Sequence, residues 1–376
     1  MAKYRIAWLP GDGIGKEVME AAKLVLDHMD LSAEYLPGDI GWEFWKKEGN
    51  PLPDRTKILL KNSDCCLLGA ITSKPKDEAE KELEANLRNR GFVYNSPIVQ
   101  IRQELNLQLN IRPCKSYEGN PLNFRNDIDL VIFRENTEGM YSGVEYHPVP
   151  VELREMLKRH NAKMSRFDSV MERDMAISLR ITTRKACQTI ARHAFEYARK
   201  MGRHKVTVVE KPNVLRETSG MMISECRKVA NEYPGIDLEE ANIDAMAMWL
   251  VKSPQKYDVL VLTNLFGDII SDLCAQLVGG LGFSPSANIG DNYAVFEPTH
   301  GSAPKYAGMY KMNPVAMLLT VKMMLDYLGE VTSATQLEQA ITKVIKEGKV
   351  RTYDMGGNSS TLQVAREVIR FLDGSA

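Results

Sequence analysis

Short runs rich in aliphatic and β-branched residues alternate with longer amphipathic stretches along the whole chain. The short runs at residues 4–9, 64–69, 129–133, 205–210 and 258–263 have the length and composition of strands. The longer stretches at residues 15–29, 183–201, 313–329 and 359–372 place apolar residues three and four positions apart, as amphipathic helices do. This alternation predicts an α/β fold with a largely parallel sheet. The 376 residues exceed a usual single core, so we expect two domains or one elaborated domain.

The composition argues against several classes of protein. A net charge of −1 gives no basis for a nucleic-acid surface, and no apolar run reaches membrane-spanning length. The N-terminal residues turn polar after a short strand-like run, without the apolar core of a signal peptide. The six cysteines show no CxxC spacing, and we expect them to be reduced core residues. We therefore expect a cytoplasmic protein that binds neither nucleic acid nor membrane.

Two aspartates, Asp268 and Asp272, interrupt the apolar run at residues 262–276. If this run is helical from about Gly267, both carboxylates lie on one face of the helix. The two anions repel each other unless a cation lies between them. Alternatively, the helix dipole favours Asp268 and a basic neighbour pairs with Asp272. This stretch alone leaves a metal site and these structural roles open.

Three arginines, Arg102, Arg112 and Arg134, stand at the ends of apolar runs, with Ser96 and Tyr141 nearby in the sequence. Because a guanidinium group pairs with a carboxylate through two hydrogen bonds, three such residues could hold a di- or tricarboxylate. Each arginine could equally close a surface salt bridge, and Tyr141 alone is more typical of packing than of acid catalysis.

Lys211 directly follows the strand-like run at residues 205–210. Ligands of open α/β sheets gather at the carboxyl ends of strands. Pro212 biases Lys211 toward extended backbone geometry. Held beside other cations, such a lysine could have a lowered pKa and exchange a proton. The alternative is an exposed lysine at a turn.

Two glycine-rich stretches could contact a nucleotide. Residues 9–15 read LPGDGIG, which lacks the GxGxxG spacing of a Rossmann fingerprint. Residues 297–308 read EPTHGSAPKYAG and precede a helix expected near Asn313. Here the backbone amides, His300, Lys305 and Tyr306 could together hold an adenosine phosphate.

Taken together, these motifs resemble one family over nearly the whole chain. LPGDGIG, SPIVQIR, NIRP, FRENTEGMYSG, KPNV, NLFGDIISD, GGLG, SANIGD, EPTHGSAP and NP occur in the order of the β-decarboxylating dehydrogenases. Members of this family oxidise and decarboxylate isocitrate, homoisocitrate or 3-isopropylmalate. The resemblance implies the two-domain isocitrate/isopropylmalate dehydrogenase-type fold rather than a Rossmann fold. It also implies a homodimer with active sites shared between the subunits.

The resemblance further implies domain boundaries. Residues 1–107 and 279–376 would form a large, cofactor-binding domain. Residues 108–138 and 184–278 would form a small domain with metal and dimer elements. Residues 139–183 would form a segment that clasps its counterpart in the dimer.

The resemblance also assigns residue roles. Asp268 and Asp272 of one chain, with Asp244 of its partner, would bind Mg²⁺ or Mn²⁺, which prefer carboxylate oxygens. Lys211, from the same partner as Asp244, would accept the substrate's hydroxyl proton, and Tyr141 would reprotonate the enol carbon. The substrate's carboxylates would be bound by Arg102, Arg112 and Arg134. Asn213 would assist in positioning the substrate.

The residues set against the distal end of the substrate favour isocitrate. Ser96 matches a serine that many isocitrate enzymes place against the γ-carboxylate, whereas Ile98 stands where those enzymes often have asparagine. We place Ser96 and Ile98 one strand or helix repeat apart at that end. The segment at residues 74–95 is longer than in many relatives and could reshape the pocket. We therefore expect isocitrate as substrate, with homoisocitrate or 3-isopropylmalate as alternatives.

The cofactor residues resemble the NADP-preferring pattern. Lys305 and Tyr306 occupy the place where NAD-preferring relatives commonly carry an aspartate, and Tyr353 fits a further phosphate contact. Gly357 lies where some NADP enzymes have an arginine. The remaining cofactor contacts implied by the resemblance are Thr72, Glu297, His300, Gly301 and Asn313. Two rival classes are a hydroxyacid lyase without nicotinamide, which would not need the HGSAPKY loop, and a non-catalytic regulatory subunit, which would be expected to lose Lys211, Tyr141 or an aspartate.

Overall fold

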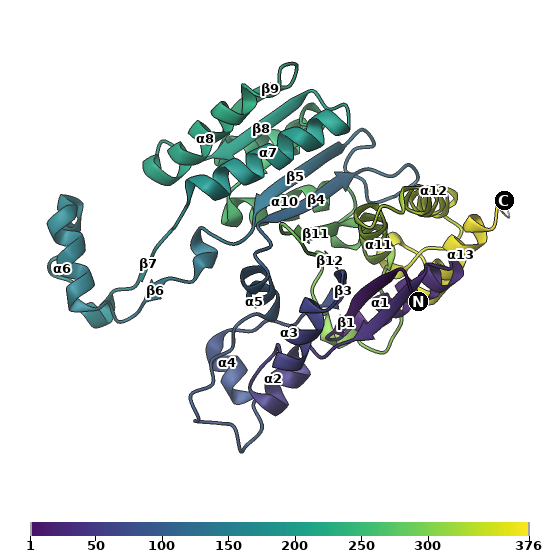
Figure 1. Cartoon of the computed structure of the whole chain (residues 1–376), viewed down its shortest axis with the longest axis horizontal. Helices are drawn as coiled ribbons and strands as arrows, with labels where there is room; N and C mark the ends of the chain where they lie inside the picture. The colour runs from purple at the N-terminus through teal and green to yellow at the C-terminus, as the bar shows by residue number, and fades with distance from the viewer. Residues whose placement is uncertain (1, 375–376) are drawn as a thin grey trace.

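One ten-stranded sheet organises the molecule, and a computed structural model describes residues 2–374 (Figure 1). The strand order is β2-β1-β3-β12-β11-β4-β5-β10-β8-β9. In chain order these strands are β1 (Tyr4–Gly11), β2 (Ala33–Pro37), β3 (Cys65–Ala70), β4 (Leu109–Lys115), β5 (Asp129–Glu135), β8 (Lys205–Glu210), β9 (Asp237–Asn242), β10 (Val259–Leu262), β11 (Pro285–Ile289) and β12 (Ala294–Pro298).

Helices cover both faces of this sheet (Figure 1). They are α1 (Gly15–His28), α2 (Trp42–Glu48), α3 (Asp54–Lys61), α4 (Lys76–Lys81), α5 (Pro97–Glu104), α6 (Val151–His160), α7 (Arg184–Lys200), α8 (Arg216–Ala230), α9 (Ile243–Lys252), α10 (Asn264–Leu277), α11 (Val315–Tyr327), α12 (Val331–Glu347) and α13 (Thr361–Leu372). All the strands and helices expected from the alternating pattern are present, with boundaries shifted by a few residues. Every residue of β3 and of β10 is buried, as expected for strands covered on both faces.

The sheet reverses direction at its centre. The pairs β12–β11, β11–β4 and β4–β5 are antiparallel, and the flanking pairs are parallel. The strands β5, β10, β8 and β9 therefore run opposite to β1, β2, β3 and β12.

Separate apolar cores lie on the two halves of the sheet. The N- and C-terminal parts of the chain form two cores, and residues 109–278 form two others. Tyr117 is an exception, because it packs into the core of the N- and C-terminal parts. The two-domain division at 107/108 and 278/279 stays a prediction.

The aspartate-bearing helix α10 begins at Asn264, three residues before the expected start at Gly267. Asp268 therefore lies in the second turn, and the first turn of α10 carries no acidic residue. Because the helix dipole acts mainly within the first turn, the dipole alternative for Asp268 is wrong.

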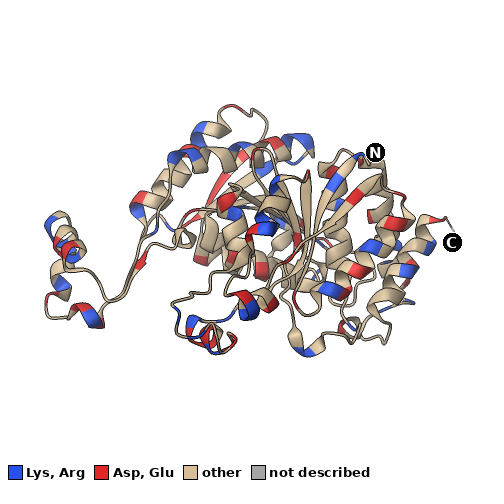
Figure 2. Ribbon diagram, turned by 60° about the horizontal axis from the view of Figure 1, so that its bottom comes forward, with Lys and Arg blue, Asp and Glu red and all other residues tan. Residues whose placement is uncertain are grey.

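The segment at residues 139–183 extends away from the body of the molecule as an arm (Figure 1). Two short antiparallel strands, β6 (Glu145–Tyr146) and β7 (Ile177–Ser178), form its stalk, and α6 lies toward its end. No residue of α6 is buried. Basic and acidic residues both occur along the ribbon of the arm (Figure 2). We call residues 139–183 the arm.

Two further expectations concern the whole chain. Among residues 2–374, no helix is both long and apolar enough to cross a membrane. All six cysteines are buried and free of disulfides, as expected from their spacing.

Candidate active site

Arg134, at the end of β5, connects the sheet to the aspartates of α10. Its side chain is 1% exposed. Its Nε and Nη2 donate to Asn264 Oδ1 at 3.0 and 2.7 Å, and its Nη1 pairs with Asp268 Oδ1. A Cβ on Gly267 would lie 2.6 Å from Arg134 Cγ. The glycine of the NLFGD motif therefore allows the guanidinium group to reach α10.

Arg112, on β4, lies beside the same two carboxylates. Its Nη1 donates to Ser271 Oγ at 2.6 Å and to Asp272 Oδ1 at 3.3 Å, and its Nη2 lies 3.5 Å from Asp268 Oδ1. The alternative that Asp272 pairs with a basic neighbour is thus seen in the isolated chain. The surface salt bridge proposed as an alternative for the arginine itself is wrong, because Arg112 is buried.

Arg102, on α5, faces the site from the other half of the sheet. Its Nε donates to Asn288 Oδ1 at 2.9 Å and its Nη2 to Glu297 Oε1 at 3.0 Å. Burial lowers the pKa of Arg134 to about 10, and the positive charges of Arg112 and Arg102 act in the same direction. Three buried guanidinium groups therefore lie close enough to repel one another, an arrangement that favours an anionic ligand.

Tyr141 lies beside Asp268, at the base of the arm. Its hydroxyl donates to Asp268 Oδ2 at 2.5 Å, and the Arg134 guanidinium lies 5.1 Å from the ring centroid. Partial burial raises the pKa of Tyr141, and the Asp268 carboxylate raises it further. The phenol therefore keeps its proton at neutral pH, which a proton donor requires.

The carboxylates of α10 suit a hard divalent cation. Burial alone would raise the pKa of Asp268, but Arg134 and Arg112 hold it below its usual value. Asp268 is thus an anion at neutral pH, and the Asp272 side chain is 60% exposed and accessible to a ligand. Carboxylate oxygens are the donors that Mg²⁺ and Mn²⁺ prefer, so these residues fit such a metal.

Lys211 and Asp244 form a separate pair. Lys211 Nζ donates to Asp244 Oδ1 at 2.6 Å, and the Asp244 side chain is 67% exposed. In the isolated chain an anion therefore lies beside Lys211, and the cationic neighbours considered from the sequence stay a prediction. Asn213 is exposed in the turn that follows. Among residues 2–374, no three acidic, histidine or cysteine side chains gather to hold a metal, so Asp244 does not join Asp268 and Asp272 within one chain.

The loop at residues 299–312 lies against the glycine-rich turn at residues 9–15. Ile14 N donates to Ser302 O at 2.9 Å, and the Ser302 and Thr72 hydroxyls lie 2.6 Å apart. The Nε2 atom of His300 is buried without a hydrogen-bond partner, and burial lowers the pKa of this imidazole. An unpaired buried nitrogen beside Gly301, whose added Cβ would meet nothing within 4 Å, is compatible with a ligand at this loop.

The three residues expected at a 2′-phosphate lie on exposed surface. The rings of Tyr306 and Tyr353 stack with centroids 6.1 Å apart, and Lys305 is exposed beside Tyr306. Asn313 is buried and donates to Asp354 Oδ2 at 3.1 Å. A Cβ at Gly357 would lie 2.2 Å from Arg351 O, so the arginine of some relatives cannot stand there without a backbone shift.

Ser96 and Ile98 have different surroundings at the start of α5. Ser96 is the N-cap of α5, and its side chain makes no capping bond, which leaves the hydroxyl available. Ile98 packs against the apolar core that contains Ile101. The expectation that Ser96 and Ile98 both line the distal end of the substrate pocket stays a prediction.

Sequence reasoning missed several residues that hold the site together. Asn264, the first residue of the NxxGDxxSD pattern, binds Arg134 and also donates to Glu138 O at 3.1 Å. Buried Glu210, next to Lys211, accepts hydrogen bonds from Ser219 Oγ at 2.5 Å and Arg180 Nη2 at 3.0 Å. Asn264 was identifiable from its place in the motif, whereas Glu210 carried no signal beyond being a charged residue at a strand end.

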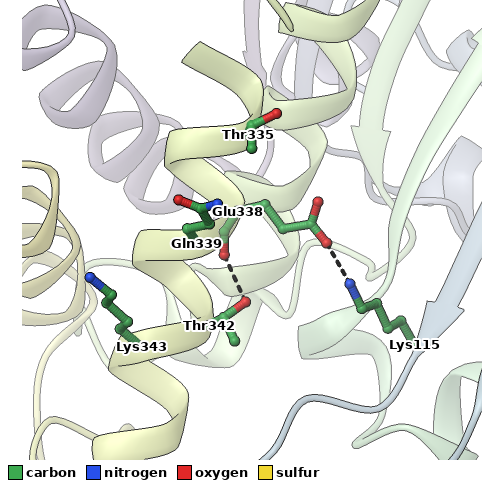
Figure 3. Close-up of a pocket in the computed structure, with 6 residues that line it drawn as sticks. All are labelled: Lys115, Thr335, Glu338, Gln339, Thr342 and Lys343. Atoms are coloured by element: carbon green, nitrogen blue, oxygen red, sulfur yellow. Dashed lines mark hydrogen bonds and ion pairs between the residues drawn. The ribbon is translucent and has the colours of Figure 1, made fainter. Parts of the chain in front are cut away.

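A hollow of about 430 Å³ lies away from these residues, between Lys115 and α12 (Figure 3). Glu338 accepts a hydrogen bond from Lys115 at 2.8 Å and lies 3.3 Å from Lys322 Nζ. No residue predicted for binding or catalysis lines this hollow. Lys115 and Glu338, which face each other across it, bond to one another, and we assign the hollow no function.

Buried arginines thus lie beside helix-borne aspartates, an arrangement that suits a carboxylate ligand and a divalent cation. Residues 5–368 match the family model described as isocitrate/isopropylmalate dehydrogenase. The chain belongs to this family, whose members carry out oxidative decarboxylation with a nicotinamide cofactor and a divalent metal. The fold class expected from the sequence is confirmed.

The proteins and solved structures that are similar to this chain have different names. The chain is 43% identical to Protein DlpA of Legionella pneumophila, over 97% of this chain and 58% of that protein. It is 43% identical to a 3-isopropylmalate dehydrogenase of Archaeoglobus fulgidus, over 98% of this chain and 99% of the relative. A homoisocitrate dehydrogenase of Methanocaldococcus jannaschii is 38% identical, over 98% of this chain and 97% of the relative. The crystal structure of isocitrate dehydrogenase from Methylococcus capsulatus has a TM-score of 0.85 and 37% identity, covering 98% of this chain and 99% of that one.

Proposed function

We propose that the protein oxidises and decarboxylates isocitrate to 2-oxoglutarate and reduces NADP. The observation that carries this proposal is the group of three buried arginines, Arg102, Arg112 and Arg134, around the α10 carboxylates. So much buried positive charge suits a substrate with several carboxylates. The free Ser96 hydroxyl at the start of α5 suits a distal carboxylate, which an isopropyl group would leave unpaired.

The chain's own residues have separate roles in this reaction. Arg112 and Arg134 hold substrate carboxylates, and Asn213 assists positioning. Lys211 would accept the proton of the substrate hydroxyl during oxidation, for which a nicotinamide held at the loop at residues 299–312 would supply the hydride acceptor, and Tyr141 would return a proton to carbon after loss of CO₂. Asp244, Asp268 and Asp272 would hold Mg²⁺ or Mn²⁺, which polarises the new carbonyl and stabilises the charge that forms on decarboxylation.

The preference for NADP rests on exposed groups near the cofactor loop. A 2′-phosphate needs a cation and hydrogen-bond donors, and Lys305, Tyr306 and Tyr353 supply both. We assign Thr72, Glu297, His300, Gly301 and Asn313 to the rest of the cofactor. The cytoplasmic location expected from the reduced cysteines belongs to the same proposal.

A homodimer with shared sites accounts for two features of the isolated chain. Lys211 and Asp244 lie apart from Asp268 and Asp272, although the reaction needs all four. In addition, α9 and α10 pack together and carry exposed apolar side chains: Met248, Trp249, Val251, Leu265 and Ile269. This apolar face lies beside both pairs of site residues and is suited to pack against a second copy of the chain.

Homoisocitrate and 3-isopropylmalate remain the second candidate substrates. The 3-isopropylmalate dehydrogenase of Archaeoglobus fulgidus is 43% identical to this chain, whereas the homoisocitrate and isocitrate dehydrogenases named above are 38% and 37% identical. Homoisocitrate adds one methylene, and a pocket discriminates one methylene by only about 1–3 kcal/mol. Side activity on homoisocitrate is therefore expected.

The deciding experiment measures kcat/KM for isocitrate, homoisocitrate and 3-isopropylmalate, each with NADP and NAD, at fixed pH and Mg²⁺ concentration. We expect isocitrate with NADP to lead, and chelation of the metal to abolish every activity. A lead of tenfold or more for homoisocitrate or 3-isopropylmalate would replace the substrate assignment. A preference of the wild-type enzyme for NAD would refute the role of Lys305 and Tyr306.

A further inference from the structure

The segment at residues 74–95 forms a small core with α2. Trp42, Trp45, Ala79, Leu83 and Leu87 are buried together, and Phe92 and Tyr94 pack against them. This core is separate from the four cores that carry the sheet. We call residues 42–48 and 74–95 the tryptophan cap.

Hydrogen bonds and an ion pair also hold the tryptophan cap together. Trp45 Nε1 donates to Ala79 O at 2.9 Å, and Trp42 Nε1 donates to Glu82 Oε2 at 2.6 Å. Lys74 pairs with the same Glu82 carboxylate. Because both indole N–H groups find partners within the cap, α2 and the 74–95 segment are held in one arrangement.

Tyr94 connects the tryptophan cap to the end of β3. Its ring packs edge-on against Trp42 and Trp45, with centroids 5.0 and 5.3 Å away. Its hydroxyl donates to the backbone oxygen of Thr72 at 2.7 Å. The apolar contacts thus orient a phenol whose hydroxyl is bonded outside the cap.

Thr72 is held on all its polar atoms. Besides the bond from Tyr94, its N–H donates to Asp12 Oδ2 at 2.8 Å, and its Oγ1 lies 2.6 Å from Ser302 Oγ. The other oxygen of Asp12, Oδ1, accepts a hydrogen bond from the backbone N–H of Trp42 at 2.7 Å. The cap therefore reaches Thr72 by two routes, through Tyr94 and through Asp12, and Thr72 contacts the loop at 299–312.

We propose that Tyr94 is a positioning residue for the cofactor, through which the tryptophan cap fixes the backbone of Thr72 beside Ser302. This inference rests on the proposed use of a nicotinamide cofactor at that loop. The hydrogen bonds of Tyr94 do not involve Lys305 or Tyr306, so Tyr94 affects the affinity for NADP and NAD alike.

The test compares Tyr94→Phe with Tyr293→Phe, using the full-length enzyme. Tyr293 is buried, and its hydroxyl lies 2.7 Å from Ser63 Oγ, a contact outside the cap and the cofactor loop. Cofactor Kd by calorimetry, cofactor KM and kcat are measured with NADP and NAD. Amide hydrogen exchange is followed at residues 70–73.

One lost hydrogen bond corresponds to a rise of about 3- to 10-fold in cofactor Kd and KM for Tyr94→Phe. We expect a kcat near that of the wild type, an unchanged NADP-to-NAD ratio and faster exchange at 70–73. Tyr293→Phe should change none of these. A wild-type Kd and wild-type exchange in Tyr94→Phe would overturn the inference. If the wild-type enzyme binds neither cofactor, the proposed function fails, while exchange at 70–73 still decides whether Tyr94 anchors Thr72.

Discussion

At the scale of single residues, the close approach of Arg134 to α10 is the most demanding contact in the site. The Arg134 side chain crosses the helix where Gly267 presents no Cβ, and an added methyl group would meet Arg134 Cβ and Cγ at 2.7 and 2.6 Å. These atoms are the base of the side chain and cannot rotate away without moving the guanidinium group. The position of Arg134 relative to Asp268 therefore depends on this glycine.

Gly267→Ala should lower kcat/KM for the hydroxyacid on the order of 100-fold, because a displacement of about 1 Å in a positioned group can cost that much. The matched control is Gly220→Ala in α8, where an added Cβ meets nothing within 4 Å. Both changes improve helix propensity by up to about 1 kcal/mol. Only Gly267→Ala should lose activity, and equal kinetics for the two variants would contradict the account of Arg134.

At the scale of elements, the arm exposes several apolar side chains on its own protomer. Val151, Met156, Phe167 and Met171 are exposed on it, and α6 has no buried residue. Arg154 provides internal support through its ion pair with Glu172 and its hydrogen bonds to the backbone oxygens of Phe167 and Asp168. Apolar side chains on a projecting element are expected to be covered in the proposed dimer.

A double variant, Val151→Glu with Met171→Glu, should weaken the dimer by more than tenfold in Kd, since each buried apolar side chain contributes about 1.5–3 kcal/mol. Sedimentation velocity across a concentration series measures the shift. The control is Ile58→Glu with Val331→Glu, which changes two equally exposed residues outside the arm. Equal dissociation of the two double variants would exclude the arm from the interface.

At the scale of the whole molecule, the sequence predicted the helices and strands better than the contacts between them. Apolar periodicity was sufficient for α1 and α7, which each bury one face against the sheet, and for α13, which packs against α1 and α12. The helix α11 is buried along most of its length, and its long apolar run indicated it. The sequence pattern did not predict the strand β4, because Pro113 interrupts its β-like run and its antiparallel pairing reverses the sheet.

The site itself followed from the sequence only through the family resemblance. Nothing in local spacing brings Arg134 to Asp268, which is 134 positions away, or Arg102 to Glu297. Such contacts depend on the order of strands in the sheet, which periodicity does not specify. The same limit applies to the tryptophan cap, because residues 74–95 pack against tryptophans that lie in α2.

The central claim is that each active site combines Lys211 and Asp244 of one chain with Asp268 and Asp272 of the other. The decisive measurement uses hybrid dimers of two inactive variants, Lys211→Met and Asp268→Asn, co-expressed with different tags. In a hybrid, one site carries both defects and the other carries none. A 1:1 mixture in which half of the dimers are hybrids should therefore recover about a quarter of wild-type activity.

The matched control combines Lys211→Met with Asp244→Asn, which affect the same half of each site, so every site in that hybrid keeps a defect and activity should stay lost. Recovery in the first pair and none in the second is the result that we predict. No recovery in purified Lys211→Met/Asp268→Asn hybrids would mean that each chain builds its site alone and would contradict the account.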